Sequence, residues 1–153
     1  MEPEPAERIV SATRAMSASA ERIFDLIADP SLQPSWDGNN NLASAAPGQR
    51  VRQVGDVFKT TLTNGGVREN HVVDFIEGSQ IAWCPAEPGK QPPGHLWRWQ
   101  VEQINSTLTN VTHTYDWTAL TDSKRLEKAR STTPEMLRES MDRLALLAQA
   151  SGG

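Results

Sequence analysis

Apolar residues recur at helical spacing near the C-terminal end of the chain, within the segment TPEMLRESMDRLALLAQ at residues 133–149. Thr133 can accept hydrogen bonds from the first free backbone N–H groups, and Pro134 suits the first turn of a helix. At ~1.5 Å per residue such a helix would be roughly 25 Å long, enough to cross a small domain. Its apolar stripe consists of residues three or four positions apart: Leu137, Met141, Leu144 and Ala148.

Before this helix, alternating apolar and polar residues predict a series of short strands. The strands are expected at residues 9–16, 41–46, 57–63, 67–76, 80–84, 96–104 and 108–118. Shorter helical segments are expected at about 20–28, 30–36 and 124–130. Asn64-Gly65-Gly66 predicts a hairpin turn, because Asn and Gly accept positive φ. The proline-rich segment 85–95 is predicted to be a long loop.

One long helix after a run of strands predicts an α+β domain with an antiparallel sheet curled around that helix. About seven strands are expected, with two short helices after the first strand. The chain of 153 residues is expected to form a single domain, 1–153, with loose tails at 1–7 and 150–153. Strand alternation then assigns side chains to the inner face of the sheet. The residues assigned inward are Phe58, Thr60, Leu62, Glu69, His71, Val73, Phe75, Ile81, Trp83, Trp97, Trp99, Val101, Val111, His113, Tyr115 and Trp117.

Composition and charge narrow the classes of function. The formal net charge is −4 and no dense basic patch occurs, so nucleic acid is not an expected partner. No apolar run approaches the ~18 residues of a membrane span, so stable membrane insertion is not expected either. Cys84 is the only cysteine, which fits a cytoplasmic location. The oligomeric state stays open, with a homodimer among the alternatives.

Several segments resemble the START-like (SRPBCC) superfamily, in particular its polyketide cyclase/dehydratase and lipid-transport branch. The resemblance lies in SASAERIFDLIADPSLQPSWD, VGDVF, HVVDFIEGSQIAW, VTHTYDWTAL and TTPEMLRESMDRLALLA, together with the order of the elements. It implies the helix-grip fold, of bacterial type, with a deep cavity between the sheet and the long helix. It also implies that a small hydrophobic molecule, lipid or polyketide-like, is the partner.

Two pairs of residues are candidates for catalysis. His113 and Tyr115 are assigned inward, where an imidazole could act as acid or base and a phenol could hydrogen-bond an enolate oxygen. Glu69 and His71 lie two residues apart on one strand, where the carboxylate could set the tautomer of the imidazole. The alternative is a histidine and a tyrosine that merely line the core, and a Glu69 that is simply solvated. The catalytic set therefore stays open.

A metal site and a cofactor are not expected, because the three histidines show no metal-binding spacing and no phosphate-binding loop is present. Many large apolar residues fall on inward positions, and these are either ordinary core or the wall of a ligand site. Two functions follow: binding of a small hydrophobic ligand, or an enzyme of the cyclase/aromatase or dehydratase type. The expected ligand-binding residues are Trp36, Phe58, Phe75, Trp83, Trp97, Trp99, His113, Tyr115, Trp117, Leu137, Met141 and Leu144.

Overall fold

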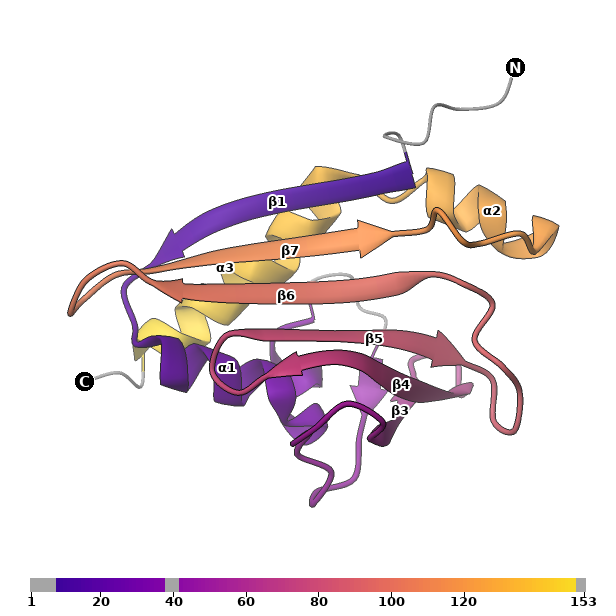
Figure 1. Ribbon diagram of the computed structural model, residues 1–153, viewed down its shortest axis with the longest axis horizontal. Helices are drawn as coiled ribbons and strands as arrows, with labels where there is room; N and C mark the ends of the chain where they lie inside the picture. Colours follow the sequence, from indigo (N-terminus) through magenta and orange to yellow (C-terminus); the bar gives the residue numbers. More distant parts are fainter. Residues whose placement is uncertain (1–7, 38–41, 151–153) are drawn as a thin grey trace.

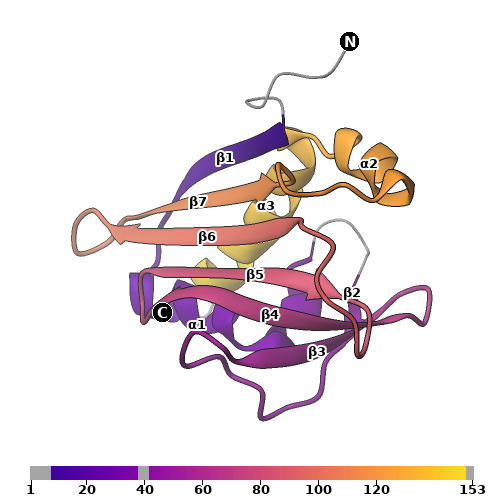
Figure 2. The same cartoon turned by 45° about the vertical axis from the view of Figure 1, so that its right-hand side comes forward.

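A computed structural model describes residues 8–37 and 42–150 of the chain. Seven strands form one antiparallel sheet in the order β1-β7-β6-β5-β4-β3-β2, so that β1 and β2 are its edges (Figures 1 and 2). The strands are β1 (Ile9–Met16), β2 (Leu42–Ser44), β3 (Val57–Leu62), β4 (Val67–Ile76), β5 (Gln80–Ala86), β6 (Leu96–Gln103) and β7 (Thr109–Asp116). The helical elements are α1 (Ala20–Ala28), the 3₁₀-helix η2 (Pro30–Ser35), α2 (Ser123–Arg130) and α3 (Pro134–Ala150).

The long helix α3 packs on one face of the curved sheet, crossing behind β1, β7 and β6 in Figure 1. The four residues of its predicted stripe are fully buried, whereas Arg138 and Asp142 on the opposite side are exposed. The α+β class expected from the pattern and the helix-grip fold implied by the resemblance are therefore confirmed. The helix continues through Ala150, which was expected to belong to a loose tail. The other residues of the predicted tails, 1–7 and 151–153, and the strand start at Asn41 lie outside the described residues.

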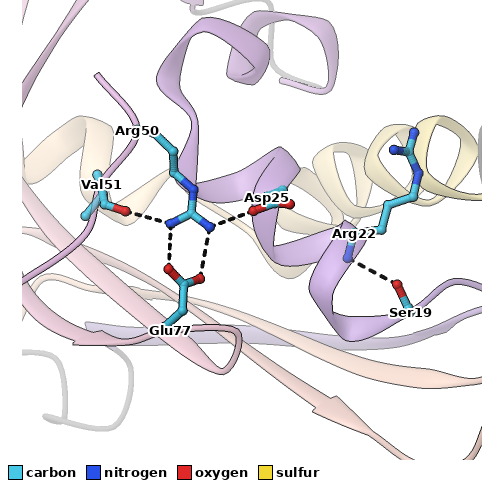
Figure 3. Close-up of polar contacts among 6 residues, drawn as sticks. All are labelled: Ser19, Arg22, Asp25, Arg50, Val51 and Glu77. Atoms are coloured by element: carbon cyan, nitrogen blue, oxygen red, sulfur yellow. Dashed lines mark hydrogen bonds and ion pairs between the residues drawn. The ribbon is translucent and has the colours of Figure 1, made fainter. Parts of the chain in front are cut away.

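The short helix α1 is capped at its start and is joined to the end of α3 by the side chain of Arg22. The Ser19 side chain accepts a hydrogen bond from the backbone N–H of Arg22, at 3.2 Å, which caps the start of α1 (Figure 3). The guanidinium of Arg22 then donates to the carbonyl oxygens of Ala148 and Leu147, at 3.1 and 3.4 Å. A cation suits the last carbonyls of a helix, because the negative end of the helix dipole lies there. Arg22 thus fixes the last turn of α3 against α1.

Arg50 joins three segments at the other end of α1 (Figure 3). Its two terminal nitrogens donate to both carboxylate oxygens of Glu77, at 3.1 and 2.9 Å. The same guanidinium donates to Asp25 on α1 at 2.6 Å and to the Val51 carbonyl at 2.6 Å. It also lies over the ring of Phe24, 5.6 Å from the ring centre. One side chain therefore holds α1, the segment before β3 and the β4–β5 turn together.

The inner face of β4 differs from the sequence-based assignment. Val73 is 48% exposed, while Val72, its neighbour, is only 3% exposed. The register of β4 against β5 shifts between Val72 and Asp74, so one residue bulges out of the ladder. A bulge reverses the alternation, and for this reason Phe75 packs on the core as expected although Val73 does not. The inward assignment of Glu69, His71 and Val73 was wrong.

Strand β5 continues beyond residue 84, where the prolines that follow were predicted to begin a loop. It includes Pro85 and Ala86, where a loop was predicted, and Pro85 lies opposite Asn70 of β4. The other neighbour, β6, pairs with β5 only as far as Trp83. At Pro85 the strand is therefore paired on one side, and a residue without an N–H is accepted at such an edge.

The burial of α3 can be tested by comparing two alanine variants. Leu144→Ala should lower the free energy of unfolding by ~2–5 kcal/mol, because Leu144 is 0% exposed and its loss leaves a cavity. Arg138→Ala, on the exposed side of the same helix, should change it by less than about 0.5 kcal/mol. Urea-induced unfolding followed by circular dichroism measures both. Equal effects would contradict this orientation of α3.

The Arg50 contacts predict a second stability difference. Arg50→Lys keeps the charge but cannot bind Glu77 through two nitrogens while also reaching Asp25 and Val51. We expect a loss of about 1–2 kcal/mol, the value of one or two charge-assisted hydrogen bonds. The matched control is Arg52→Lys, an exposed position two residues away. If both variants unfold at the same urea concentration, the Arg50 contacts do not stabilise the fold.

Candidate functional site

A cavity of about 380 Å³ lies between the inner face of the sheet and the helices. Five neighbouring strands, β3 to β7, each contribute two residues at positions i and i+2, which is the period of side chains on one face of a strand. These ten residues are Thr60, Leu62, Arg68, Asn70, Trp83, Pro85, Trp97, Trp99, His113 and Tyr115.

The remaining wall comes from the helices and from segments next to them. Met136 and Ser140, four residues apart on α3, face the cavity, while the segment around η2 adds Gln33 and Trp36. The N-terminal half of α3 therefore borders the cavity, whereas its C-terminal half packs beside β1 and α1. Figure 2 shows α2 beyond the end of β7, close to the loop that joins β5 and β6. The lining is completed by Asp37, Leu42, His95, Lys124, Arg125, Lys128 and Thr132.

Aromatic rings form a continuous wall on β6 and β7. His113 stacks on Trp99, with ring centres 3.7 Å apart and planes at 11°. Trp97 lies 4.3 Å from Tyr115, and Trp36 meets Trp99 edge-on at 5.2 Å. The indole N–H of Trp36 donates to the Leu26 carbonyl at 2.8 Å, which fixes the ring over the cavity. A wall of this kind suits a flat or apolar ligand, because aromatic faces offer a large contact area with few rotatable bonds.

The ionisable groups inside the cavity are neutral at physiological pH. Burial lowers the pKa of His113 to about 3, because no nearby anion compensates the lost hydration of an imidazolium. Burial also raises the pKa of Tyr115 to about 12, so its phenol stays protonated. The Nδ1 atom of His113 is buried and has no hydrogen-bond partner among the described residues. The interior therefore carries polar atoms but no charge from these two side chains.

His95 lies in the cavity wall between Tyr115 and the cationic lining residues Arg68, Arg125 and Lys128. Its ring meets that of Tyr115 edge-on at 6.1 Å. Burial, followed by the positive charges of Arg125, Lys128 and Arg68, lowers the pKa of His95 to about 4. The preceding Gly94 has φ +127°, and a Cβ there would lie 2.4 Å from the Ala119 carbonyl oxygen. Only glycine allows this close approach, so Gly94 sets the position of His95.

A few neutral polar side chains lie deep in the cavity wall. The Asn70 amide donates to the Phe58 carbonyl at 3.1 Å and to the Thr60 hydroxyl at 3.2 Å. Gln33 donates to the Ile27 carbonyl at 3.0 Å and is only 2% exposed. These contacts hold each amide in one orientation. Such groups can orient a bound molecule, as fixed polar groups do in mainly apolar pockets.

Six of the predicted ligand-binding residues line the cavity and six do not. The lining ones are Trp36, Trp83, Trp97, Trp99, His113 and Tyr115. Phe58, Phe75, Trp117, Leu137, Met141 and Leu144 are absent from the lining and belong to the surrounding core. The stripe of α3 packs directly on the sheet, because its leucine and methionine side chains fill the space between the helix and the sheet.

The second pair of catalytic candidates lies outside the cavity. Glu69 accepts a hydrogen bond from the Gly89 backbone at 2.9 Å and lies 3.8 Å from the Lys59 ammonium, on the outer side of the sheet. His71 is paired between Val57 and Cys84 on the same outer side. Since the β4 bulge reversed the expected alternation, neither side chain faces His113 or Tyr115. The structure brings only these latter two candidates together.

Sequence reasoning missed the polar part of the lining. The inward assignment of Glu69 and His71 left Asn70 and Arg68 on the outer face by alternation, and Ser140 lies beside the apolar stripe of α3, not on it. A usable signal was present in α2, where Lys124 and Lys128 are four residues apart and must share a side of the helix. What that side faces could not be read from the segment, because the position of α2 depends on the turn after β7.

Within the described part of the chain, no group of three His, Cys, Asp or Glu side chains is arranged to hold a metal ion. Among the same residues, no helix has the length and apolar character needed to cross a membrane. The expected lack of a cofactor, the cytoplasmic location and a homodimer stay predictions.

The chain is similar in sequence to two uncharacterized proteins of Mycobacterium tuberculosis. One, from strain CDC 1551 / Oshkosh, is 30% identical over 112 residues, which are 72% of this chain and 48% of that protein. The other, from strain H37Rv, is 28% identical over a similar stretch with the same coverage. The chain thus spans about half the length of the curated relatives it matches. No family model matches the sequence.

Comparison with solved structures shows the fold. A START superfamily protein from Mycobacterium smegmatis superposes with a TM-score of 0.64 at 18% identity, covering 93% of this chain and 97% of that one. Protein MLL2253 from Mesorhizobium loti gives 0.69 at 16% identity, with coverages of 94% and 98%. A point mutant of norcoclaurine synthase from Thalictrum, in complex with a transition state analogue, gives 0.60 at 13% identity, with coverages of 95% and 96%. The chain has the helix-grip fold of START-like proteins.

The buried His113 predicts a dependence of stability on pH. Its pKa of about 3 in the folded chain lies below the ordinary value of 6.5, so the unfolded chain binds more protons between these values. The stabilisation is full above about pH 6.5 and is lost as the pH falls toward 3. His113→Phe removes the imidazole while leaving an aromatic ring on Trp99, so between pH 7.5 and 4.5 the variant should lose about 2 kcal/mol less than the wild type.

Urea-induced unfolding of both proteins at several pH values measures this difference. Carboxylates and His95 titrate in both proteins, so only the difference between the two curves reports on His113. Parallel curves would show that the imidazole is not buried in its neutral form.

Proposed function

We propose that this chain binds one small, largely apolar molecule in the cavity between its sheet and the helix α3. The observation that carries the proposal is the 380 Å³ cavity with an aromatic wall on β6 and β7. That volume falls within the range of small-molecule sites in proteins. A lipid or polyketide-like molecule, the class implied by the sequence resemblance, has the apolar body that this wall would contact.

The chemistry of the lining supports an apolar ligand body. Trp97, Trp99, Trp83 and Tyr115 face a space in which His113 is neutral. Contact of an apolar molecule with these rings would remove apolar surface from water at about 25 cal/mol per Å². The fixed amides of Asn70 and Gln33 would orient the molecule without contributing charge. One structural neighbour, the norcoclaurine synthase, has a transition state analogue bound, so this fold can hold a small molecule.

A second candidate function is proton-transfer catalysis of the cyclase/aromatase or dehydratase type. One observation favours it: His113 presents an imidazole with an unpartnered Nδ1 beside Tyr115 in a cavity. A neutral imidazole can accept a proton, and a phenol can donate a hydrogen bond to a developing enolate oxygen.

The pKa of His113 weighs against this second function. General bases work best when their pKa lies near the working pH, and about 3 is far below neutrality. The other candidates for a base, Glu69 and His71, lie on the outer side of the sheet. Catalysis would require a bound substrate whose negative charge lies close to His113 and raises this pKa. We rank ligand binding first because it needs no such change.

The binding proposal predicts that a neutral fluorophore enters the cavity. N-phenyl-1-naphthylamine should quench the tryptophan emission of the wild type, because four of the five tryptophans line the cavity. Ser140→Phe, which places a ring into the cavity from α3, should abolish quenching. Ser140→Ala at the same position should leave it within about twofold, since the cavity keeps its volume.

Circular dichroism and urea-induced unfolding show whether each variant is folded, so that a loss of quenching can be assigned to the filled cavity. If Ser140→Phe is unfolded, Met136→Trp fills the cavity from the preceding turn of α3 and replaces it in the test. No quenching in the wild type, or unchanged quenching in a folded variant with a filled cavity, would refute the proposal.

A further inference from the structure

The charged side chains of the cavity are concentrated at one end. Four cationic residues from two elements form this end: Arg68 on β4, and Lys124, Arg125 and Lys128 on α2. We call these four residues the basic rim. The only carboxylate among the described lining residues is Asp37, and it already accepts a hydrogen bond from the Leu42 backbone at 2.8 Å. A chain with a net charge of −4 thus places an excess of positive charge at its cavity.

Burial shows that the basic rim is the mouth of the cavity. Of the lining residues, Lys124 and Lys128 are the two that are exposed. The opposite end is formed by buried residues, among them Trp99, His113 and Ser140. A molecule bound in the cavity would therefore have one end in a neutral interior and the other end beside lysine side chains in contact with water.

Most of the basic rim forms no ion pair with a carboxylate in the described part of the chain. Arg125 pairs with Asp122 and lies 3.6 Å from Glu87. Lys124, Lys128 and Arg68 form no ion pair with any described residue; Arg68 donates instead to the Val67 carbonyl at 3.0 Å. Lys124 and Lys128 are also like charges at i and i+4 on one helix, an arrangement that destabilises a helix unless an anion lies between them.

The positive charges act on the same region of the cavity. Arg125, Lys128 and Arg68 each lower the pKa of His95, which stands between the basic rim and Tyr115. Charges from a strand and from a separate helix thus produce one positive potential at the mouth. An anionic group placed there would gain mainly from Lys124, Lys128 and Arg68, because Arg125 already pairs with Asp122 and lies near Glu87. It would stay partly hydrated, so little desolvation would oppose it.

We infer that the natural ligand is an anionic amphiphile, whose apolar ring or chain fills the aromatic interior and whose acidic group lies at the basic rim. The acidic group is a carboxylate or another oxyanion, for which lysine and arginine are the usual partners. This inference rests on the proposed binding function and adds the class of ligand to it. It also gives a direction of entry, with the apolar end first.

Two fluorophores with the same ring system separate charge from shape. N-phenyl-1-naphthylamine is neutral, and 8-anilinonaphthalene-1-sulfonate adds one sulfonate to the same rings. The wild type should bind the sulfonate with higher affinity than the neutral compound at low ionic strength. This preference should shrink in about 0.5 M NaCl, because salt screens charges at an exposed mouth.

The basic rim is tested by Lys124→Gln/Lys128→Gln. This double variant should raise the Kd of the sulfonate about fivefold to tenfold and leave the Kd of the neutral compound within about twofold. The matched control, Arg138→Gln/Arg143→Gln, removes the same charge from the exposed side of α3 and should change neither Kd by more than about twofold. Ser140→Phe should abolish binding of both compounds, which places the sulfonate in the cavity.

Each other outcome overturns the inference in a recognisable way. If the neutral compound binds but the sulfonate loses no affinity in the lysine variant, or loses it equally in the control, the anionic class is wrong while the proposed function stands. If neither compound binds the wild type, the proposed function fails and the inference fails with it. If the lysine variant loses binding to phosphatidylcholine–phosphatidylserine vesicles but keeps its sulfonate affinity, the rim contacts membranes and not a ligand.

Discussion

Packing of α3 against the concave face of the sheet is the contact on which the other features depend. Leu144, Ala145 and Ala148 in its C-terminal half are fully buried, and Arg22 fixes its last carbonyls to α1. This half closes the fold with a continuous core. The N-terminal half instead presents Met136 and Ser140 to open space. The C-terminal half of this helix thus covers one end of the sheet, and its N-terminal half forms part of the wall of a cavity at the other end. The cavity exists because α3 packs closely on the sheet along only part of the helix.

The cavity combines a neutral interior with a charged mouth, and both properties have the same physical origin. Burial suppresses ionisation wherever no counter-charge is present, which keeps His113 and Tyr115 neutral. Lysine side chains tend to keep their charged ends in water, and Lys124 and Lys128 are the exposed members of the lining. The separation of apolar and charged surface along one cavity is the feature that relates the fold to an amphiphilic ligand.

Several buried polar atoms have no partner among the described residues, including Nδ1 of His113, Nδ1 of His95, Nε2 of His71 and the indole nitrogen of Trp117. An unsatisfied buried polar atom is unfavourable by about 1–3 kcal/mol, so such atoms need an explanation. His113 and His95 line the cavity, where a bound molecule or water could meet their hydrogen-bonding requirement. His71 and Trp117 do not line it, and the ring of Trp117 lies under the guanidinium of Arg8. Only His113 and His95 are therefore consistent with a site that binds a polar group of a ligand.

The sequence alone determined the elements, because period and caps are local: the stripe of α3, the Thr133 cap and the alternation of Trp97, Trp99, His113 and Tyr115 all predicted their places. It also predicted the aromatic wall, since strands β6 and β7 have no bulge to change their phase. Tertiary structure decided the rest. The β4 bulge turned Asn70 inward and His71 outward, a change of one residue that no local pattern marks. The orientation of α2, and with it the basic rim, depends on contacts between segments distant in sequence.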